Sequence, residues 1–381
     1  MSETSQLGPD VLVEAVVGPE ARPDQARLFS RCFAKPTGVE ALRWRYDANP
    51  HGEAVSLVLR DEADHAVCSY AYVPRLAVAR VDGQAAEGLI GQQGDVMTDP
   101  EWQRQGLARR LVKHCARETA AAGFLMDWGF PNRQSAPVFL KFDWRSVGAI
   151  RPKRHLLRAD ARARARRLAD GRLAAWLVGR DRRRCARARA ALGGLPAGYE
   201  LRPVERWAPF GDRVTELSRA VEARFPFMLR RDAAWMDWRF VDTPSGAHRG
   251  HGLFGPDGEL AGWVVIQVPP GAGARGFPGA SGVGYLVELL CPDEDLVPAL
   301  VGAGLDLLAG AGASVAEAWS VDGSWWQGHL VRAGFLDARP ENHLYVYMFP
   351  LVDEDHPVVR AAADASTWYL CDGDRDDETM G

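Results

Sequence analysis

One stretch of this 381-residue chain carries more structural information than any other, and it reads Asp95-Val96-Met97-Thr98-Asp99-Pro100-Glu101-Trp102-Gln103-Arg104-Gln105-Gly106-Leu107-Ala108-Arg109-Arg110-Leu111. The pattern predicts a strand, a tight polar turn with the spacing Gln-x-x-Gly-x-Ala, and then a helix. The start of a helix has backbone N–H groups without partners and positive partial charge, so it favours anions. Gly106 removes a side chain where a diphosphate must approach the backbone, and nearby arginines add positive charge. The turn therefore suits a phosphate-bearing cofactor held mainly by main-chain donors.

Two other kinds of phosphate-binding loop are excluded at this turn. No Gly-Lys-Ser/Thr follows it, as a Walker-type loop requires, and the Gly-x-Gly-x-x-Gly fingerprint of dinucleotide-binding folds is absent.

The turn instead resembles motif A of the GNAT superfamily of acyl-CoA-dependent N-acyltransferases, whose signature is Gln/Arg-x-x-Gly-x-Gly/Ala after a strand. A second family signature, Asn-x-x-Ala-x-x-Leu-Tyr-x-Lys-x-Gly-Phe, is similar in register to residues 132–144, which follow the apolar run 124–130. One predicted helix, 107–122, separates the two signatures. The resemblance covers residues 11–157.

Composition places the chain among ordinary globular proteins. Two domains are expected, because 381 residues are more than a domain with a single hydrophobic core usually contains. A formal net charge of −4 gives no general reason to expect nucleic-acid binding. Six scattered cysteines without a Cys-x-x-Cys pair argue against a disulfide framework or a zinc site and favour a cytoplasmic location. No secretory signal pattern is seen, and the apolar run 296–313 is interpreted as a buried helix because Asp306 interrupts it.

A repeat indicates two copies of one fold. Residues 44–50 recur as 238–244, each beginning Trp-Arg-aromatic and ending in Pro, and residues 128–144 align with 319–335 without a gap. Both copies predict the same order of elements. In the first copy these are strands 55–60, 67–81 and 87–98, helix 107–122 and strand 124–130. In the second they are strands 251–254, 260–268 and 284–290, helix 296–309 and strand 315–321.

The second copy lacks the chemistry of the first. Where motif A stands in the first copy, the second has Cys291-Pro292-Asp293-Glu294-Asp295-Leu296. Acidic side chains at a helix start stabilise the helix but repel a diphosphate. We therefore expect the second copy to bind no CoA, and to pack against the first copy and shape the acceptor cleft.

The predicted fold class is α/β (α+β, GNAT-like), with two tandem copies, each a mixed twisted sheet flanked by helices with splayed central strands. Four parts are expected: a GNAT acyl-CoA-binding catalytic domain at 1–157, an arginine-rich helical linker at 158–195, a degenerate GNAT-like domain at 196–350, and a C-terminal strand with an acidic tail at 351–381. The linker arginines form either a solvated face or a contact with an acidic partner, a membrane surface or a substrate carrier.

The resemblance implies where acetyl-CoA, or a longer acyl-CoA, lies as co-substrate; no metal is implied. The pantetheine arm is expected between the two splayed strands, on the main chain of Val96, Met97 and Thr98. The diphosphate is expected on the turn, at Gln103, Arg104, Gln105, Gly106, Leu107, Ala108 and Arg109. Asn132 matches a family position whose side-chain amide contacts the pantetheine or braces the loop, although a plain helix N-cap is the alternative.

The reaction implied is direct attack of an amine on the thioester, with a backbone N–H near Met97 stabilising the oxyanion. The tyrosine that often protonates the leaving thiolate in this family is replaced by Phe139, and the usual glutamate base has no clear counterpart. Asp95 and Asp127 are the nearest carboxylates on the splayed strands, and burial would raise the pKa of either one toward that of a base. The alternative for each is a structural role.

The sequence therefore predicts an acyl-CoA-dependent N-acyltransferase, an N-acetyltransferase in the simplest case, that acylates a primary amine of a small molecule or peptide in a ternary complex. One alternative is a catalytically weak GNAT-like binding or regulatory protein that retains CoA. A second is an aminoacyl-type transferase using charged tRNA, which the intact CoA motif disfavours. The segments 44–50 and 129–132 also look like a GNAT subgroup met in bacterial polysaccharide and secondary-metabolite gene clusters. Neither a nucleic-acid partner nor a transmembrane segment is expected, and no oligomeric state is predicted.

Overall fold

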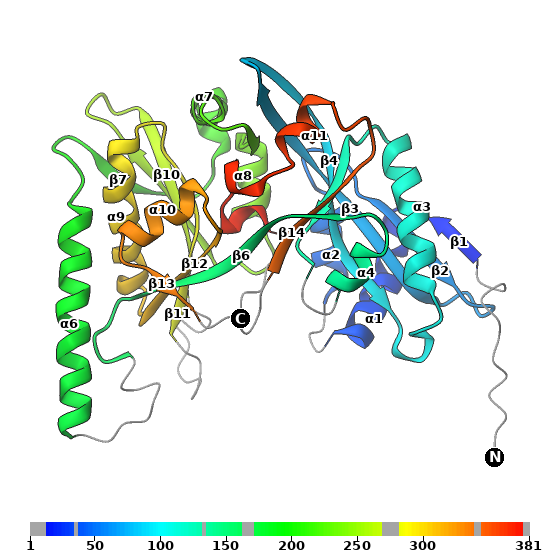
Figure 1. Ribbon diagram of the computed structural model, residues 1–381, viewed down its shortest axis with the longest axis horizontal. Coiled ribbons are helices and arrows are strands. Elements are labelled where there is room, and N and C mark those ends of the chain that lie inside the picture. Colours follow the sequence, from blue (N-terminus) through cyan, green and yellow to red (C-terminus); the bar gives the residue numbers. More distant parts are fainter. Residues whose placement is uncertain are drawn as a thin grey trace.

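The computed structural model describes residues 13–33, 37–131, 135–161, 171–268, 282–338 and 344–375. Two α/β halves lie side by side, and one continuous sheet runs through both of them (Figure 1). Along the main path of this sheet the strands follow the order β1-β2-β3-β4-β5-β14-β6-β12-β11-β10-β9-β7. The predicted fold class, a tandem pair of α/β copies, is confirmed.

The first half is built on four antiparallel strands and one parallel strand. The antiparallel strands are β1 (Val13–Val16), β2 (Val55–Arg60), β3 (Ala66–Val81) and β4 (Gln84–Thr98), and β5 (Met126–Gly129) runs parallel to β4. Alternate residues of β3 face opposite sides of the sheet. Tyr70 and Tyr72 pack under α3 (Leu107–Ala121), whereas Ala71 and Val73 pack with α1 (Arg22–Cys32) and α2 (Val39–Tyr46).

The second half repeats this arrangement. Strands β9 (His248–Phe254), β10 (Leu260–Gln267) and β11 (Val283–Leu290) are antiparallel, and β12 (Val315–Val321) runs parallel to β11. Helix α9 (Val297–Gly310) joins β11 to β12, as α3 joins β4 to β5. The remaining helices and edge strand are α6 (Arg172–Leu192), β7 (Glu200–Val204), α7 (Asp212–Glu222) and α8 (Ala233–Phe240).

The other described elements are short or connect the halves. They are η2 (Pro19–Ala21), η3 (Pro100–Trp102), α4 (Ala136–Leu140), β6 (Arg145–Leu156), η4 (Ala208–Phe210), β8 (Phe227–Leu229), η5 (Glu294–Leu296), α10 (Trp325–Arg332), β13 (Leu336–Asp337), β14 (Leu344–Pro350), α11 (Pro357–Ala361), η6 (Ala365–Thr367), β15 (Trp368–Tyr369) and η7 (Asp372–Asp374).

The apolar run 296–313 is a buried helix, as expected. Leu300, Leu305 and Leu308 of α9 are buried in the core of the second half, against β10 and β11. No helix in the described part of the chain has both the length and the apolar character needed to cross a membrane.

The two halves exchange their last long strands. Strand β6 follows the first copy in sequence but pairs with β12 of the second copy over seven residues. Strand β14 follows the second copy but pairs with β5 of the first copy. The two exchanged strands also pair with each other, at the centre of the sheet. Figure 1 shows β6 crossing from one half to the other beside β14.

The repeat in the sequence becomes a reciprocal contact in the structure. The rings of Trp44 on α2 and Trp238 on α8 stack at a centroid distance of 4.8 Å and an angle of 13°. Each indole N–H donates to the backbone carbonyl of the other tryptophan, at 2.8 Å in both directions. Equivalent residues of the two copies therefore meet each other, as they do across a two-fold axis.

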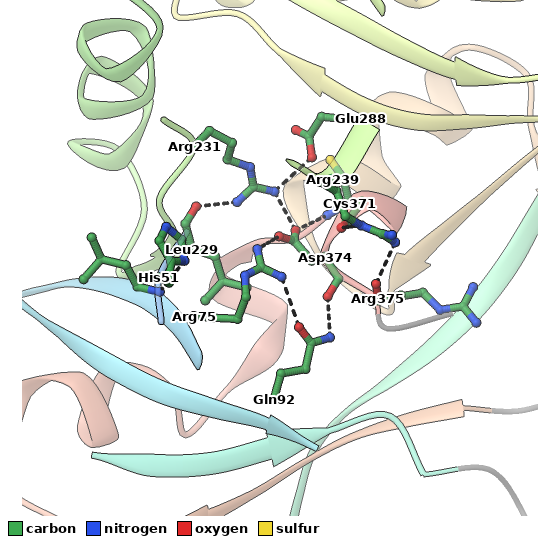
Figure 2. Close-up of polar contacts among 12 residues, drawn as sticks. His51, Arg75, Gln92, Leu229, Arg231, Arg239, Glu288, Cys371, Asp374 and Arg375 are labelled. Atoms are coloured by element: carbon green, nitrogen blue, oxygen red, sulfur yellow. Dashed lines mark hydrogen bonds and ion pairs between the residues drawn. The ribbon is translucent and has the colours of Figure 1, made fainter. Parts of the chain in front are cut away.

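A buried polar cluster joins the halves through the C-terminal segment (Figure 2). Asp374 in η7 accepts from Arg231 of the second half at 2.6 Å and lies 3.3 Å from Arg75 on β3. The side chain of Gln92 on β4 donates to the Asp374 carbonyl at 2.7 Å, and Glu288 on β11 accepts from Arg231 at 3.1 Å. All these charged groups are buried, so each depends on its partners for compensation.

Removing the carboxylate of Asp374 leaves two buried guanidinium groups without their shared partner. We expect Asp374→Ala to lower the free energy of unfolding by about 3–5 kcal/mol, the usual cost of breaking a buried ion pair on one side. Denaturant titration measures this change. Asp355→Ala, at an exposed site, is the matched control and should change the free energy of unfolding by less than about 0.5 kcal/mol. Equal effects of the two substitutions would contradict the bridging role of Asp374.

Candidate active site

The turn before α3 has a backbone shape that few residues adopt. Arg104 has φ of 64° and Gly106 has φ of 80°, so two residues of the turn are left-handed. Gly106 is the N-cap of α3, with no side-chain cap, and no atom lies within 4 Å of the position a Cβ would take. Residues 103–106 are exposed. The predicted glycine turn is therefore open to solvent at the start of its helix.

The backbone donors of this turn are available. Within the described residues, the N–H groups of residues 103–109 have no hydrogen-bond partner, and the first to donate is that of Arg110, to the Gly106 carbonyl at 3.1 Å. The first turn of α3 contains no acidic residue. A row of free N–H groups at a helix start is a favourable seat for a diphosphate.

The second half has a short acidic turn, η5, directly before α9. The Asp293 carboxylate accepts from the Asp295 N–H at 3.0 Å, and Glu294 forms an ion pair with Arg224. In the first half Asp99 accepts from the Glu101 N–H in the same way, at 3.1 Å, so this contact does not distinguish the copies. They differ because the second half has acidic side chains directly before its helix and no glycine N-cap, and acidic charge there disfavours an anion. That the second copy binds no CoA stays a prediction.

Strands β4 and β5 separate beyond a short paired region. They pair only at Gly91 with Asp127 and at Gln92 with Trp128, although β4 continues to Thr98. A bulge in the β3–β4 pairing places Asp95 and Val96 opposite Tyr70 alone, and Asp95 has φ of 45°. The edge of β4 that faces the split thus offers backbone groups unpaired by β5, which an amide-rich ligand can satisfy.

The predicted pantetheine residues lie on this diverging part of β4. Val96 packs with the core under α3, and Met97 packs on the opposite face against Leu28 of α1. The Thr98 carbonyl accepts from the Gln103 side-chain amide at 3.2 Å, which ties the end of the strand to the turn. Asn132 lies outside the described residues.

Asp127 is a buried carboxylate near the apex of the split. Its side chain is fully buried between β5 and α3, and Oδ2 lies 3.1 Å from the Thr119 hydroxyl. Oδ1 has no hydrogen-bond partner among the described residues. Burial raises the pKa of Asp127 well above its usual range, although Thr119 opposes the shift. Gly91 makes room for this group, because a Cβ there would lie 2.6 Å from Oδ1.

Asp95 is held by two residues of α2. Its Oδ2 forms an ion pair with Arg45 and accepts from the Tyr46 hydroxyl at 2.5 Å. Burial, reinforced by the Asp95 carboxylate, raises the pKa of Tyr46 well above its usual range, so this phenol stays protonated. The two candidate bases therefore lie in different surroundings, one anchored by a cation and the other in an apolar core. From the sequence, the Trp-Arg-Tyr segment was recognised only as part of the repeat. The contacts of Arg45 and Tyr46 with Asp95 were not predicted.

The aromatic residues near the split belong to the core. Phe139, at the family's tyrosine position, is buried against Trp144 at a ring distance of 4.9 Å. Tyr70 and Tyr72 are fully buried, and the Tyr72 hydroxyl donates to that of Tyr70 at 2.9 Å. Burial raises the pKa of both tyrosines well above the usual range.

A small cavity lies between the halves on the α2 side of β4. Its volume is about 20 Å³, room for about one water molecule. The stacked pair Trp44 and Trp238 forms part of its wall, and β4 contributes Gln92 and Gly94. The other lining residues are Arg45, Val73, Arg75, Arg239 and Arg375. No group of three or more potential metal-ligating His, Cys, Asp or Glu side chains was found in the described part of the chain.

Comparisons with solved structures agree on the fold of the whole chain. A probable N-acyltransferase from Enterococcus faecalis has a TM-score of 0.60 at 11% identity, covering 89% of this chain and 72% of the other. N-myristoyltransferase from Saccharomyces cerevisiae with bound myristoyl-CoA has a TM-score of 0.59 at 14% identity, covering 92% and 81%. A tandem GNAT protein from the clavulanic acid biosynthesis pathway has a TM-score of 0.53 at 15% identity, covering 90% and 100%.

Sequence comparisons identify the first half. No curated protein matches the chain significantly. A family model described as an acetyltransferase (GNAT) domain matches residues 17–147, which extend from the end of β1 into β6 and include the glycine turn and the split strands. The chain therefore contains a GNAT acetyltransferase domain, at residues 17–147, within a fold like that of tandem GNAT proteins.

Proposed function

We propose that the protein is an acyl-CoA-dependent N-acyltransferase that acylates a primary amine of a small molecule or peptide. The observation that carries the proposal is the row of free N–H groups at 103–109, which follows the part of β4 that has diverged from β5. The diphosphate of CoA would bind the main chain from Gln103 to Arg109, with Arg104 and Arg109 adding charge. The pantetheine arm would run along Val96, Met97 and Thr98, and Asn132 is proposed as a further contact on the basis of the family motif alone.

The reaction proposed is direct attack of the neutral amine on the thioester carbonyl. The bulge at Asp95 and Val96 turns the backbone of β4 at the split, and an N–H near Met97 would stabilise the oxyanion. The C–S bond then breaks and CoA leaves as a thiolate. A thiol pKa near ~8.5 makes protonation of this leaving group undemanding, which is consistent with phenylalanine at 139.

Asp127 is the proposed base, with Asp95 as the second candidate. A base must accept the proton of the incoming ammonium, and Asp127 has a buried oxygen without a partner and a raised pKa. The oxygen of Asp95 nearest α2 is already engaged by Arg45 and Tyr46. We propose that Asp95 mainly fixes the bulge that presents the backbone N–H.

The acyl group proposed is acetyl or another short chain. The match of residues 17–147 to a family model described as an acetyltransferase (GNAT) domain supports an acetyl donor. Because the fold is also similar to that of N-myristoyltransferase, a long-chain acyl-CoA is the donor to compare with acetyl-CoA in assays.

A second candidate function is a binding or regulatory protein that retains CoA without turnover. It is favoured by Phe139, which is buried in the core and can donate no proton. Mass spectrometry of the purified protein for retained acyl-CoA, followed by CoA-release assays with a panel of amines and with acetyl-CoA or myristoyl-CoA, separates the two. Release of CoA that depends on an amine supports the enzyme, and binding without release supports the alternative.

Gly106→Glu tests the diphosphate site. The new carboxylate would place negative charge at the helix start and repel the diphosphate, so we expect loss of the calorimetric acyl-CoA binding signal. Gly123→Glu is the matched control, since Gly123 lies just after the other end of α3 with nearly the same φ of 82° and equally open space. It should keep its binding signal. Unchanged binding by Gly106→Glu would remove the cofactor assignment.

Asp127→Asn tests the base through the pH profile. A base must be unprotonated, so wild-type kcat should rise with pH through a pKa that burial has raised above the usual carboxyl range. We expect the substitution to lower kcat by about 10²-fold or more, with little change in KM, and to remove this rise. If Asp95→Asn removes the rise and Asp127→Asn keeps it, the base is Asp95.

A further inference from the structure

Helix α6 carries an unusual charge. Between Arg172 and Leu192 it has seven arginines against one acidic residue, Asp181, which is buried. Arg189 is paired with Asp306, and Arg180 contacts Asp181 at 3.3 Å. In contrast, four arginines have no partner among the described residues, namely Arg172, Arg182, Arg183 and Arg187. Like charges this close destabilise an isolated helix, so an external anion would stabilise α6.

Most of these charges lie on one face. Residues 180, 183, 184 and 187 have the spacing i, i+3, i+4 and i+7, which places them along one side of a helix. They line an open hollow of about 380 Å³, which Ala188 and Gly334 complete. None of the residues that line this hollow is acidic.

Exposed apolar side chains continue the same face. Leu173 and Trp176, two turns and one turn before Arg180, are 63% and 56% exposed, and the Arg180 guanidinium lies 5.0 Å from the Trp176 ring. We call this surface the α6 face: it comprises residues 173, 176, 180, 183, 184 and 187.

We propose that the α6 face docks the protein on an anionic phospholipid surface, with guanidinium groups on lipid phosphates and Trp176 and Leu173 at the headgroup level. Arginine binds phosphate through paired N–H groups, and each arginine close to an anionic leaflet adds to the affinity. Tryptophan prefers the interface between headgroups and acyl chains. The proposal is independent of the acyltransferase assignment.

The shape of the molecule favours a membrane over other anionic partners. In Figure 1 helix α6 forms one end of the molecule, and its lower part, which bears Leu173 and Trp176, projects past the strands of the second half. Helix α3 lies at the other end, so docking leaves the glycine turn uncovered. An acidic protein would match the arginines but gives no role to the projecting apolar end, and single-stranded nucleic acid would need more than one aromatic ring for stacking.

Vesicle co-sedimentation tests the proposal with the full chain. We expect binding to phosphatidylcholine vesicles that contain phosphatidylglycerol, no binding to phosphatidylcholine alone, and weakening as salt is raised. Arg183→Ser with Arg187→Ser removes two charges that pair with no other described residue, and should weaken binding about 30-fold. Trp176→Ala should weaken binding while keeping its salt dependence.

The matched control removes two equally exposed charges from elsewhere. Arg182 lies on the other side of α6, and Arg219 is on α7, so Arg182→Ser with Arg219→Ser gives the same net charge and should bind like the wild type. Circular dichroism and thermal melting establish that each variant is folded. The proposal is overturned if the two double variants lose vesicle binding equally, or if the wild type does not bind anionic vesicles. Binding to polyglutamate but not to vesicles also overturns it and assigns the face to an acidic protein.

Discussion

The exchange of β6 and β14 is the constraint on which the rest of this structure depends. Strand β5 has four residues, pairs with β4 at two positions only, and then diverges from it. A strand so short and so weakly paired would be a poor edge by itself. It is held because β14, from the other copy, pairs with all four of its residues. The split between β4 and β5 can therefore stay open without loosening the sheet, and the second half is needed for the geometry of the first.

The two copies differ at the turn that precedes the equivalent helix. Both have a strand, a short turn and a helix in the same order. In the first copy the turn has left-handed residues, a glycine cap and free N–H groups. In the second, α9 follows directly on η5, whose residues Asp293, Glu294 and Asp295 are acidic, and its N-cap is Leu296. Side-chain caps and bound anions use the same backbone donors at a helix start.

Local elements were predictable from the sequence, because periodicity and turn chemistry are local. Strand β2 begins and ends where it was predicted, and β3, β4, α3, β10 and β12 differ by three residues or fewer at each end. The strand exchange was not predictable, since an apolar strand such as β14 carries no local signal of which half it will pair with. The role of the acidic tail was also missed: nothing in its sequence indicated that Asp372 and Asp374 would be buried.

The candidate site also has a part that the sequence could predict and a part that it could not. The free N–H groups at 103–109 follow from glycine and helix geometry, so the sequence was sufficient to predict an open turn. The surroundings of the two carboxylates were not, because Arg45 and Tyr46 reach Asp95 from a helix about fifty residues away, and Asp127 meets Thr119 across a helix–sheet contact. Such pairings arise from tertiary packing, which outweighs local preference.

The stacked Trp44 and Trp238 also join the two halves. The late position of β14 in the sequence has a separate consequence, which concerns biosynthesis. Strand β5 leaves the ribosome about two hundred residues before the strand that completes it. At ordinary elongation rates, this interval lasts roughly 10–40 s. During this time the nascent first half presents an unsatisfied β edge to its surroundings. A chaperone that binds early would raise the fraction of new chains that reach the native state. The charged segments that follow β5 would have the same effect if they slow aggregation.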